Sequence, residues 1–595
     1  METKKRLEAL RASMKKNKID MYLIPMSDFH SSEYVTDYFK ETEFLTGFTG
    51  ENATVVVTQT KSGLWTDGRF FIQAKRELKG SGTTLFEMGE EGVPTVSEYV
   101  KKNLKANQTL GYDGRVISLE NHRKFEKIAK ENKAKINVKK NLIDGIWKDR
   151  PQFPKTSLWI LQKKYAGATL EEKLNNLRAE MKKLGADAHL ITCLYDNAWL
   201  LNLRADDIES VPVFMSYVYV KKNKCVLYAF KEAIDKKVEK YLADNNVELK
   251  DYDEIYKDLA KETAKKVLID PSIVNVALVK SFPAKTEFVE DFNPTELARA
   301  IKNKTEIKNT KEAHIKDGVA VTKFIYWLKN HVGKEEITEL SASDVLLKYR
   351  KEQKNFLDVS FETISAYGPN AAMMHYSANE EHNAVIKNKS FLLVDSGGHY
   401  LEGTTDITRT IAVGPLTKEE KHAFTTVVRC NLRLQEARFP KGCIGQNLDI
   451  LARGPVWDEG LDYRCGTGHG VGHILSVHEG PQRFHWKVAD KSKVWEVRPG
   501  MITTDEPGLY VEDGYGIRIE NELLCVEDKK TEYGQFYKFE QLTFCPIEIE
   551  AINVEELTHL ERKALNDYHA AVYEKISPYL TKAEAAWLKK VTKPL

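Results

Sequence analysis

The chain has 595 residues, which is too many for one hydrophobic core, so we expect about three domains. Hydrophobic residues make up 42% of the chain and charged residues 30%, as in ordinary soluble globular proteins. The formal net charge is only +2, so we expect no long-range field that would attract nucleic acid or a membrane surface.

No segment of the sequence predicts membrane insertion or secretion. No apolar stretch approaches the roughly 20 residues of a membrane span. The N-terminal METKKRLEALRASMKK lacks the apolar centre of a signal peptide. The seven cysteines are scattered from Cys193 to Cys545 and form no CxxC pair. We therefore expect a reduced, cytoplasmic protein without a disulfide framework.

A repeat is visible in the first half of the chain. KRLEALRASMKKNKIDMYLI (5–24) and EKLNNLRAEMKKLGADAHLI (172–191) share many residues in the same register. Leu7, Leu10 and Met14 have the i, i+3, i+7 spacing of one helix face, and an apolar run typical of a buried strand follows each helix. EFLTGF and AWLLNL lie in similar positions further along. Two copies in one register predict two duplicated α/β domains of about 150 residues each.

The domain boundaries follow from composition. Two prolines bracket a polar stretch in WKDRPQFPK, which predicts a boundary between domains 1–153 and 154–312. A charged helical segment, ELARAIKNKTEIKNTKEAH, then leads into a third domain, 313–595. The last domain is expected to close with helices, because Thr558–Glu561 and Thr581–Glu584 both fit capping boxes.

Two aspartates of the third domain stand close to a predicted turn. Asp395 lies near the end of the apolar strand FLLVDSGGHY, and Asp406 lies inside the alternating LEGTTDITRTIAV. A hairpin would bring the two carboxylates together. Each also has an ordinary interpretation, with Asp395 capping a turn and Asp406 facing solvent.

Two glutamates and one histidine have similar settings. Glu506 follows a strand in MITTDEPGLYV, and Glu520 lies in the alternating YGIRIENELL, where Arg518 and Glu520 could instead form an exposed ion pair. His469 lies in CGTGHGVGH (465–473). So many glycines predict a backbone that turns tightly or lies very close to something.

The chemistry of these side chains indicates metal ions. Four carboxylates cannot be buried together without cations, and two divalent ions would balance them. Oxygen ligands with a single imidazole suit Mn²⁺, and also Co²⁺, Fe²⁺ or Zn²⁺. The glycine run lacks the GxGxxG spacing of a dinucleotide loop. Ser396 is no nucleophile elbow either, because GxSxG would need glycine where Val394 stands.

These segments resemble the pita-bread metallopeptidases, and among them the X-prolyl aminopeptidases. DSGGHYLEGTTDITRT, GTGHGVGHILSVHEGP and DEPGLY…GIRIEN carry the resemblance, and EFLTGFTG, WTDGRFFIQA and AWLLNLR extend it into the first half. It implies an α/β protein with two creatinase-like N-terminal domains followed by an α+β pita-bread catalytic domain. It also implies two divalent ions per chain, Mn²⁺ foremost with Zn²⁺ or Co²⁺ as alternatives. The implied metal ligands are Asp395, Asp406, His469, Glu506 and Glu520.

The resemblance further implies residues that handle the substrate. Glu506 would accept a proton from the bridging water as well as bind metal. His375 in AAMMHY and His478 in SVHEGP match positions that contact substrate and transition state. Arg69 in WTDGRFF matches an arginine of the first domain that reaches the catalytic site.

Other positions are implied to support the site or to stand outside it. Tyr510 and Arg518 match a network around Asp395 that orients metal ligands. His473 stands where the family has an apolar or small residue, so we interpret it as non-catalytic. Cys465 replaces a histidine that many family members carry, which argues against an essential imidazole at that point.

The activity implied is metal-dependent removal of the first residue from peptides with proline at position two, by a hydroxide that bridges two metals. The alternative within the fold is a Xaa-Pro dipeptidase, or prolidase. A further alternative is a non-catalytic peptide-binding pita-bread protein, although such proteins lose metal ligands. The resemblance also implies a homodimer, for which Trp457 is either an interface anchor or a core tryptophan.

Overall fold

The computed structural model describes residues 2–487 and 494–595, which fall into two compact units. The first unit holds Met1–Gln162 and Ala168–Thr295, and the second holds Lys163–Gly167 and Glu296–Leu595. The predicted boundaries at 153 and 312 stay predictions. Within the described ranges, no helix combines the length and apolarity that a membrane crossing requires.

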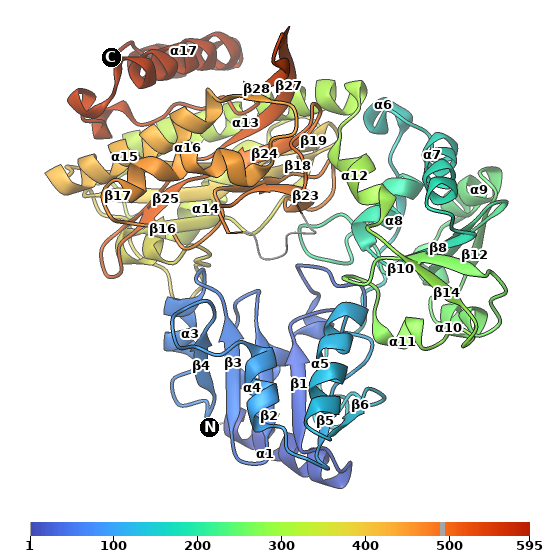
Figure 1. Cartoon of the computed structure of the whole chain (residues 1–595). Coiled ribbons are helices and arrows are strands. Elements are labelled where there is room, and N and C mark those ends of the chain that lie inside the picture. The colour runs from blue at the N-terminus through green and yellow to red at the C-terminus, as the bar shows by residue number, and fades with distance from the viewer. Residues whose placement is uncertain (1, 488–493) are drawn as a thin grey trace. The chain divides into compact units, whose positions relative to one another are not determined.

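The first unit contains two six-stranded sheets with one topology (Figure 1). In each, a central strand is antiparallel to one neighbour and parallel to the other. The first sheet has the order β4 (Thr84–Glu87), β3 (Ser62–Thr66), β2 (Thr54–Thr58), β1 (Met21–Pro25), β5 (Thr109–Gly111), β6 (Lys135–Asn137). The second has the order β12 (Val247–Lys250), β11 (Lys224–Ala229), β10 (Ser216–Lys221), β8 (Ala188–Ile191), β13 (Lys266–Ile269), β14 (Glu287–Glu290). The predicted duplication is therefore present strand for strand.

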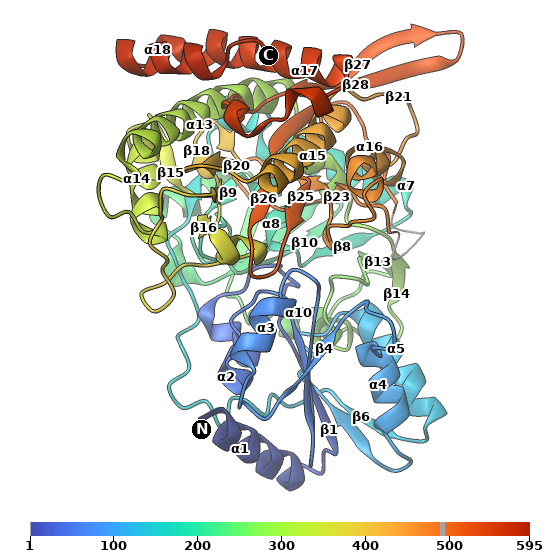
Figure 2. The same ribbon diagram turned by 90° about the vertical axis from the view of Figure 1, so that its left-hand side faces the viewer.

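Alternation along β1 explains why helices cover both faces of the first sheet. Tyr22 and Ile24 face the cluster that contains Leu10 of α1 (Glu2–Lys16). Met21 and Leu23 face the cluster beneath α4 (Val96–Asn103) and α5 (Leu119–Glu131). Figure 2 shows α1 on one side of this sheet and α4 and α5 on the other.

The repeated helices bury equivalent faces. The predicted apolar face of α1 is buried, as is the equivalent face of α7 (Leu170–Lys183). EFLTGF and AWLLNL contain the last turns of α2 (Glu41–Thr46) and α8 (Leu194–Leu201), which are followed by the left-handed residues Gly47 and Asn202. The remaining elements are α3 (Phe71–Glu77), α4 (Val96–Asn103), α5 (Leu119–Glu131), β7 (Trp159–Ile160), β9 (Leu203–Arg204), α9 (Lys236–Asp244), α10 (Glu254–Leu259) and α11 (Val276–Val279).

The second unit packs helices around antiparallel sheets. Its largest sheet has the order β21 (Arg438–Pro440), β28 (Gly534–Gln541), β27 (Asn521–Thr531), β24 (Ile502–Asp505), β22 (Gly468–Gly470), β23 (Glu479–Phe484). The smaller sheets are β16 (Ile364–Tyr367) with β17 (Phe391–Ser396) and β20 (Ile407–Ala412); β15 (Phe356–Val359) with β18 (Gly398–Tyr400) and β19 (Gly403–Thr404); and β25 (Gly508–Tyr510) with β26 (Gly516–Arg518).

The helices of this unit are α6 (Lys163–Ala166), α12 (Pro294–Ala300, which starts at the unit boundary), α13 (Lys304–His331), α14 (Glu339–Lys351), α15 (Lys418–Gln435), α16 (Gly445–Trp457), α17 (His559–Ile576) and α18 (Lys582–Val591). Figure 2 shows α17 and α18 along one edge of the unit, where both contact α13. Both predicted capping boxes are present, since Thr558 and Thr581 each cap a helix with the glutamate three residues on.

Candidate metal centre

Two adjacent strands place the aspartates. Asp395 lies near the end of β17 and Asp406 directly precedes β20, and these strands pair antiparallel with Asp395 opposite Thr408. The expected juxtaposition therefore occurs, with one difference. The intervening residues are not a simple turn, because β18 and β19 leave this pair and join β15 in another sheet.

Neighbouring strands of the six-stranded sheet place the other three side chains. His469 lies in the middle of β22, Glu506 follows the last residue of β24, and Glu520 precedes β27. Since β22 pairs with β24 and β24 pairs with β27, the three positions meet at one end of the sheet. The strand expected around Glu520 is interrupted at residues 519–520, between β26 and β27. Ile517 and Ile519 nevertheless both lie in the hydrophobic core, as the alternation predicts. Arg518 and Glu520 are both buried, so the exposed ion-pair interpretation is wrong.

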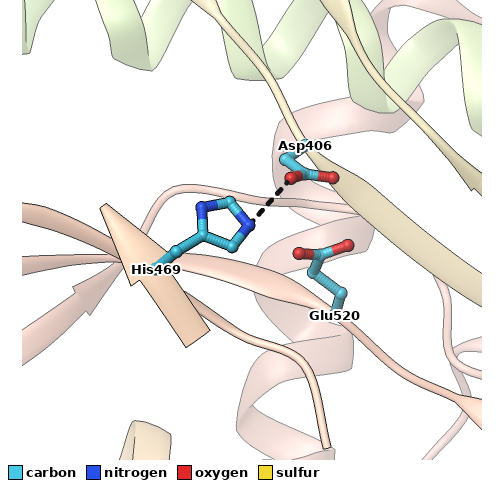
Figure 3. Close-up of side chains that lie close together, drawn as sticks. All are labelled: Asp406, His469 and Glu520. Carbon is cyan, nitrogen blue, oxygen red and sulfur yellow. Dashed lines mark ion pairs between the residues drawn. The ribbon is translucent and has the colours of Figure 1, made fainter. Parts of the chain in front are cut away.

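The side chains converge (Figure 3). Ligand atoms of Asp406, His469 and Glu520 all lie within 4.8 Å of one another. His469 Nε2 is 3.5 Å from Asp406 Oδ2 and 3.5 Å from Glu506 Oε1. These distances are too long for hydrogen bonds. Two ligand atoms that each lie about 2.1 Å from one ion are roughly 3–4 Å apart, so the spacing fits shared coordination.

The protonation of His469 also fits a ligand. Its Nδ1 lies 2.9 Å from the carbonyl oxygen of Gly470, which can only accept a hydrogen bond. Nδ1 must therefore donate this hydrogen bond, which leaves Nε2, on the side of Asp406 and Glu506, as the ring nitrogen that can bind a metal.

The carboxylates are buried at an electrostatic cost. Asp395 Oδ1 and Asp406 Oδ1 are buried and accept no hydrogen bond from any described residue. Burial raises the pKa of Asp406 well above its ordinary value, and the charges of Asp395 and Glu506 raise it further. Burial raises the pKa of Glu520 in the same way, followed by the charges of Asp406 and Asp395. Divalent cations would satisfy the unpartnered oxygens and cancel this repulsion, so the donor set fits two metal ions.

Supporting side chains hold two of the carboxylates. Arg518 donates to Asp395 Oδ2 through Nε at 3.1 Å and Nη2 at 2.6 Å, and through Nη1 to the Tyr510 hydroxyl at 2.6 Å. The Thr408 hydroxyl donates to Glu520 Oε2 at 2.8 Å. Tyr510 and Arg518 thus form one hydrogen-bonded chain with Asp395, and their role in orienting a metal ligand stays a prediction.

The two candidate substrate histidines lie beside this centre in different ways. The ring centroids of His478 and His469 are 4.2 Å apart, and the two rings are nearly perpendicular. The segment before His375 packs on β26, since a Cβ at Gly516 would lie 1.8 Å from the Ala371 carbonyl oxygen. Arg518 Nη2 also lies 3.4 Å from the carbonyl oxygen of Met374. The segment that carries His375 therefore lies next to Arg518, the residue that donates hydrogen bonds to Asp395.

Arg69 belongs to the first unit, where it pairs with Asp67. Its Nε and Nη2 each lie 2.9 Å from an oxygen of that carboxylate. Burial alone would lower the pKa of Arg69, but the pairing with Asp67 raises it above its usual value. A role for Arg69 in substrate binding stays a prediction.

Comparison with known proteins agrees with this geometry. Residues 308–527 match the description "Metallopeptidase family M24", and residues 535–595 match the C-terminal region of these peptidases. Residues 6–144 and 149–306 each match a creatinase/prolidase N-terminal domain. Xaa-Pro aminopeptidase 1 of Dictyostelium discoideum is 37% identical, with 99% of this chain and 96% of the relative covered. The chain belongs to the Xaa-Pro aminopeptidase family of M24 metallopeptidases.

Solved structures place the chain within that family. An X-prolyl aminopeptidase from Caenorhabditis elegans, described as a cytosolic enzyme with a di-nuclear active site, superposes with a TM-score of 0.96. It is 32% identical and covers 100% of both chains. A prolidase from Thermococcus sibiricus gives a TM-score of 0.51 at 25% identity and covers 64% of this chain and 98% of its own. The predicted fold class, two creatinase-like domains followed by a pita-bread metallopeptidase domain, is confirmed.

The glycine run of this Xaa-Pro aminopeptidase homologue packs against neighbouring strands. A Cβ at Gly468 would lie 1.8 Å from the carbonyl oxygen of Thr504, and one at Gly470 would lie 2.2 Å from that of Glu479. The close approach expected from the sequence is present. Its partners are the backbones of β24 and β23, which hold the metal-binding strands together, rather than the metal site itself.

Two residues singled out in the glycine run have ordinary contacts. The buried His473 ring lies 3.2 Å from the Thr310 hydroxyl and 3.2 Å from the Tyr165 carbonyl oxygen. The carbonyl oxygen of Cys465 accepts a hydrogen bond from Arg453 at 2.9 Å, and its side chain packs at the edge of the hydrophobic core.

Sequence reasoning missed two buried groups that hold Asp406. Glu522 Oε1 accepts the backbone N–H of Asp406 at 2.7 Å, and His314 Nε2 lies 3.1 Å from the same oxygen. The period-two spacing of Glu520 and Glu522 could have indicated the second glutamate. His314 lies on α13, well before Asp406 and Glu522 in the chain, and no local sequence pattern indicates its contact with them.

Proposed function

We propose that this protein is a dinuclear metallo-aminopeptidase that removes the N-terminal residue from peptides with proline at position two. The observation that carries the proposal is the convergence of three carboxylates, Asp406, Glu506 and Glu520, on the imidazole of His469. A fourth carboxylate, Asp395, lies on the strand that pairs with β20 directly after Asp406. The name of the Dictyostelium relative and the description of the C. elegans enzyme support the substrate class.

The residues proposed to hold the metals are Asp395, Asp406, His469, Glu506 and Glu520. Mn²⁺ is the proposed metal, because oxygen donors with a single imidazole suit it. Two bound divalent ions would supply a hydroxide nucleophile at neutral pH and stabilise negative charge that develops on the scissile carbonyl.

The side chains of this chain would supply the remaining steps. Glu506 is half-buried beside His469, and we propose that it accepts the proton of the attacking water. The proline nitrogen belongs to a tertiary amide and must gain a proton to leave. His478 and His375 are the proposed substrate-side groups, and Arg69 is a proposed substrate contact from the first unit.

A prolidase is the alternative within the fold, and full-length similarity disfavours it. The C. elegans aminopeptidase matches this chain from end to end, whereas the T. sibiricus prolidase covers 64% of it. A non-catalytic binding protein is disfavoured by the five intact donors. Hydrolysis of Arg-Pro-Pro and of an Xaa-Pro dipeptide by the Mn²⁺-loaded protein separates these functions. The proposal expects cleavage of the tripeptide and loss of that activity in EDTA.

We also propose a cytoplasmic homodimer. Trp457 is 37% exposed, which disfavours a core role, and its ring lies 5.6 Å from that of the exposed Trp486. Ile450 and Leu451 of the same helix α16 and the nearby Leu461 in the sequence are also exposed apolar residues. Sedimentation tests this, with Trp457→Glu expected to yield monomers where the wild type forms dimers.

A further inference from the structure

A buried three-charge cluster lies next to the metal centre. The Glu479 carboxylate contacts Arg299 Nη1 at 2.6 Å through Oε2 and the Lys302 ammonium through Oε1. The Glu479 side chain is fully buried, and those of Arg299 and Lys302 are at most 4% exposed. Lys302 also donates to the backbone carbonyl of Arg299 at 3.0 Å. We call Arg299, Glu479 and Lys302 the ion triad.

Stability is a weak reason for such a cluster. Three charges lose their hydration on burial, and apolar residues of similar volume often replace buried ion pairs without loss. The contacts of Glu479 with the rest of the chain indicate a different role for the cluster.

Glu479 connects the two segments that carry His469 and His478. It directly follows His478, whose ring lies 4.2 Å from that of His469. Its backbone pairs with Gly470, the residue after His469. Its carboxylate packs against Gly472, where an added Cβ would lie 3.3 Å from Oε2. One anchored side chain thus fixes two segments, and each segment carries one of the two histidines.

We propose that the ion triad is a positioning group for the reaction: Arg299 and Lys302 clamp Glu479, and the clamp holds His478 in register with His469. Because Glu479 directly follows His478 in the chain, the triad is proposed to act on the reaction through the position of His478. This inference rests on the proposed peptidase function, and it adds three residues to which that function assigns no role.

A double-mutant cycle between Glu479→Gln and His478→Ala tests the inference. Glu479→Gln keeps the shape of the side chain and removes its charge. We expect kcat on Arg-Pro-Pro to fall about 10–100-fold, as for other residues that orient site groups, with metal stoichiometry unchanged. In the His478→Ala background, Glu479→Gln should lower kcat by less than about threefold, because the side chain that Glu479 positions is gone.

Two further variants keep the test decisive. Asp317→Asn breaks another buried pair of the same unit, Asp317 with Arg350 at 2.8 Å, and should lower Tm without changing kcat of the folded enzyme. If Glu479→Gln fails to fold, Lys302→Met leaves the Arg299–Glu479 pair and should show the same non-additivity with a smaller loss.

The outcomes distinguish this inference from the function on which it rests. Equal fold-losses in both backgrounds, or a loss of metal in Glu479→Gln, overturn the positioning role while the peptidase function stands. A wild-type protein that does not hydrolyse Arg-Pro-Pro overturns both.

Discussion

Arg518 donates two hydrogen bonds to one oxygen of Asp395, Oδ2, while the other oxygen, Oδ1, accepts none from any described residue. The arginine therefore orients the carboxylate and leaves its free oxygen for a cation. Because Arg518 also contacts the Tyr510 hydroxyl, the orientation of Asp395 depends on a chain of buried groups.

Arg518→Lys separates orientation from charge. A lysine keeps the positive charge but lacks the planar fork, so it cannot make both hydrogen bonds to Asp395. We expect activity at saturating Mn²⁺ to fall about 10–100-fold. Arg350→Lys is the control, because Arg350 makes a similar buried pair with Asp317. The control should lose stability only, and an equal loss of kcat in the two variants would contradict the orienting role.

Glu520→Gln and His478→Ala should separate metal binding from substrate handling. The first removes a charge from the cluster of Figure 3, so metal content and activity should fall together. The second should keep two ions per chain and lose kcat by roughly 10²–10⁴-fold. Cys465→Ser is the matched control in the glycine run, and it should change metal content and kcat only slightly. Metal analysis beside kcat decides the point, and normal metal content in Glu520→Gln would count against the ligand assignment.

Metal removal should make stability depend on pH. In the metal-free folded state the pKa of Asp406 and of Glu520 lies above the ordinary values of 3.8 and 4.5. The folded state then binds protons more tightly than the unfolded chain. The free energy of unfolding is therefore highest below the unfolded pKa and falls as pH rises through the raised folded pKa.

Thermal unfolding of EDTA-treated protein measures this effect. From about pH 5 to about pH 8, the Tm of the metal-free form should fall relative to that of the Mn²⁺-loaded form. Mn²⁺ binding should release protons, detectable by calorimetry in two buffers. Metal-free Asp406→Asn should show a shallower slope. A Tm difference that stays constant or shrinks with rising pH would contradict the electrostatic account.

Gly468→Ala tests the close strand packing. Its Cβ would lie 1.8 Å from a backbone oxygen of Thr504, which cannot move without disturbing β24. We expect a loss of about 1–3 kcal/mol in the free energy of unfolding. Gly454→Ala is the control, because Gly454 lies in α16 with open space around its Cβ position. Gly454→Ala should be neutral or slightly stabilising. Chemical denaturation measures the free energy of unfolding of both variants, and an equal loss in the two would contradict the importance of the close contact at Gly468.

The sequence allowed the helix faces and the five proposed ligands to be predicted because each has a local signature. The spacing of Leu7, Leu10 and Met14 predicts a buried helix face, and the second copy of the repeat has the same pattern. The supports of the site have no such signature. Arg299 and Glu479 are 180 residues apart, and only the folded sheet brings them together. The separate sheet formed by β18 and β19 with β15 could not be predicted for the same reason, because β15 lies well before them in the chain.

The specificity of the Mn²⁺-loaded protein tests the central claim most directly. The measurement is kcat/KM for Arg-Pro-Pro and for Arg-Ala-Pro under identical conditions. The account predicts release of arginine from the first peptide and little cleavage of the second, because the site is proposed to accept a proline ring and to protonate its nitrogen. Equal kcat/KM values for the two peptides would contradict the assignment as a proline-specific aminopeptidase.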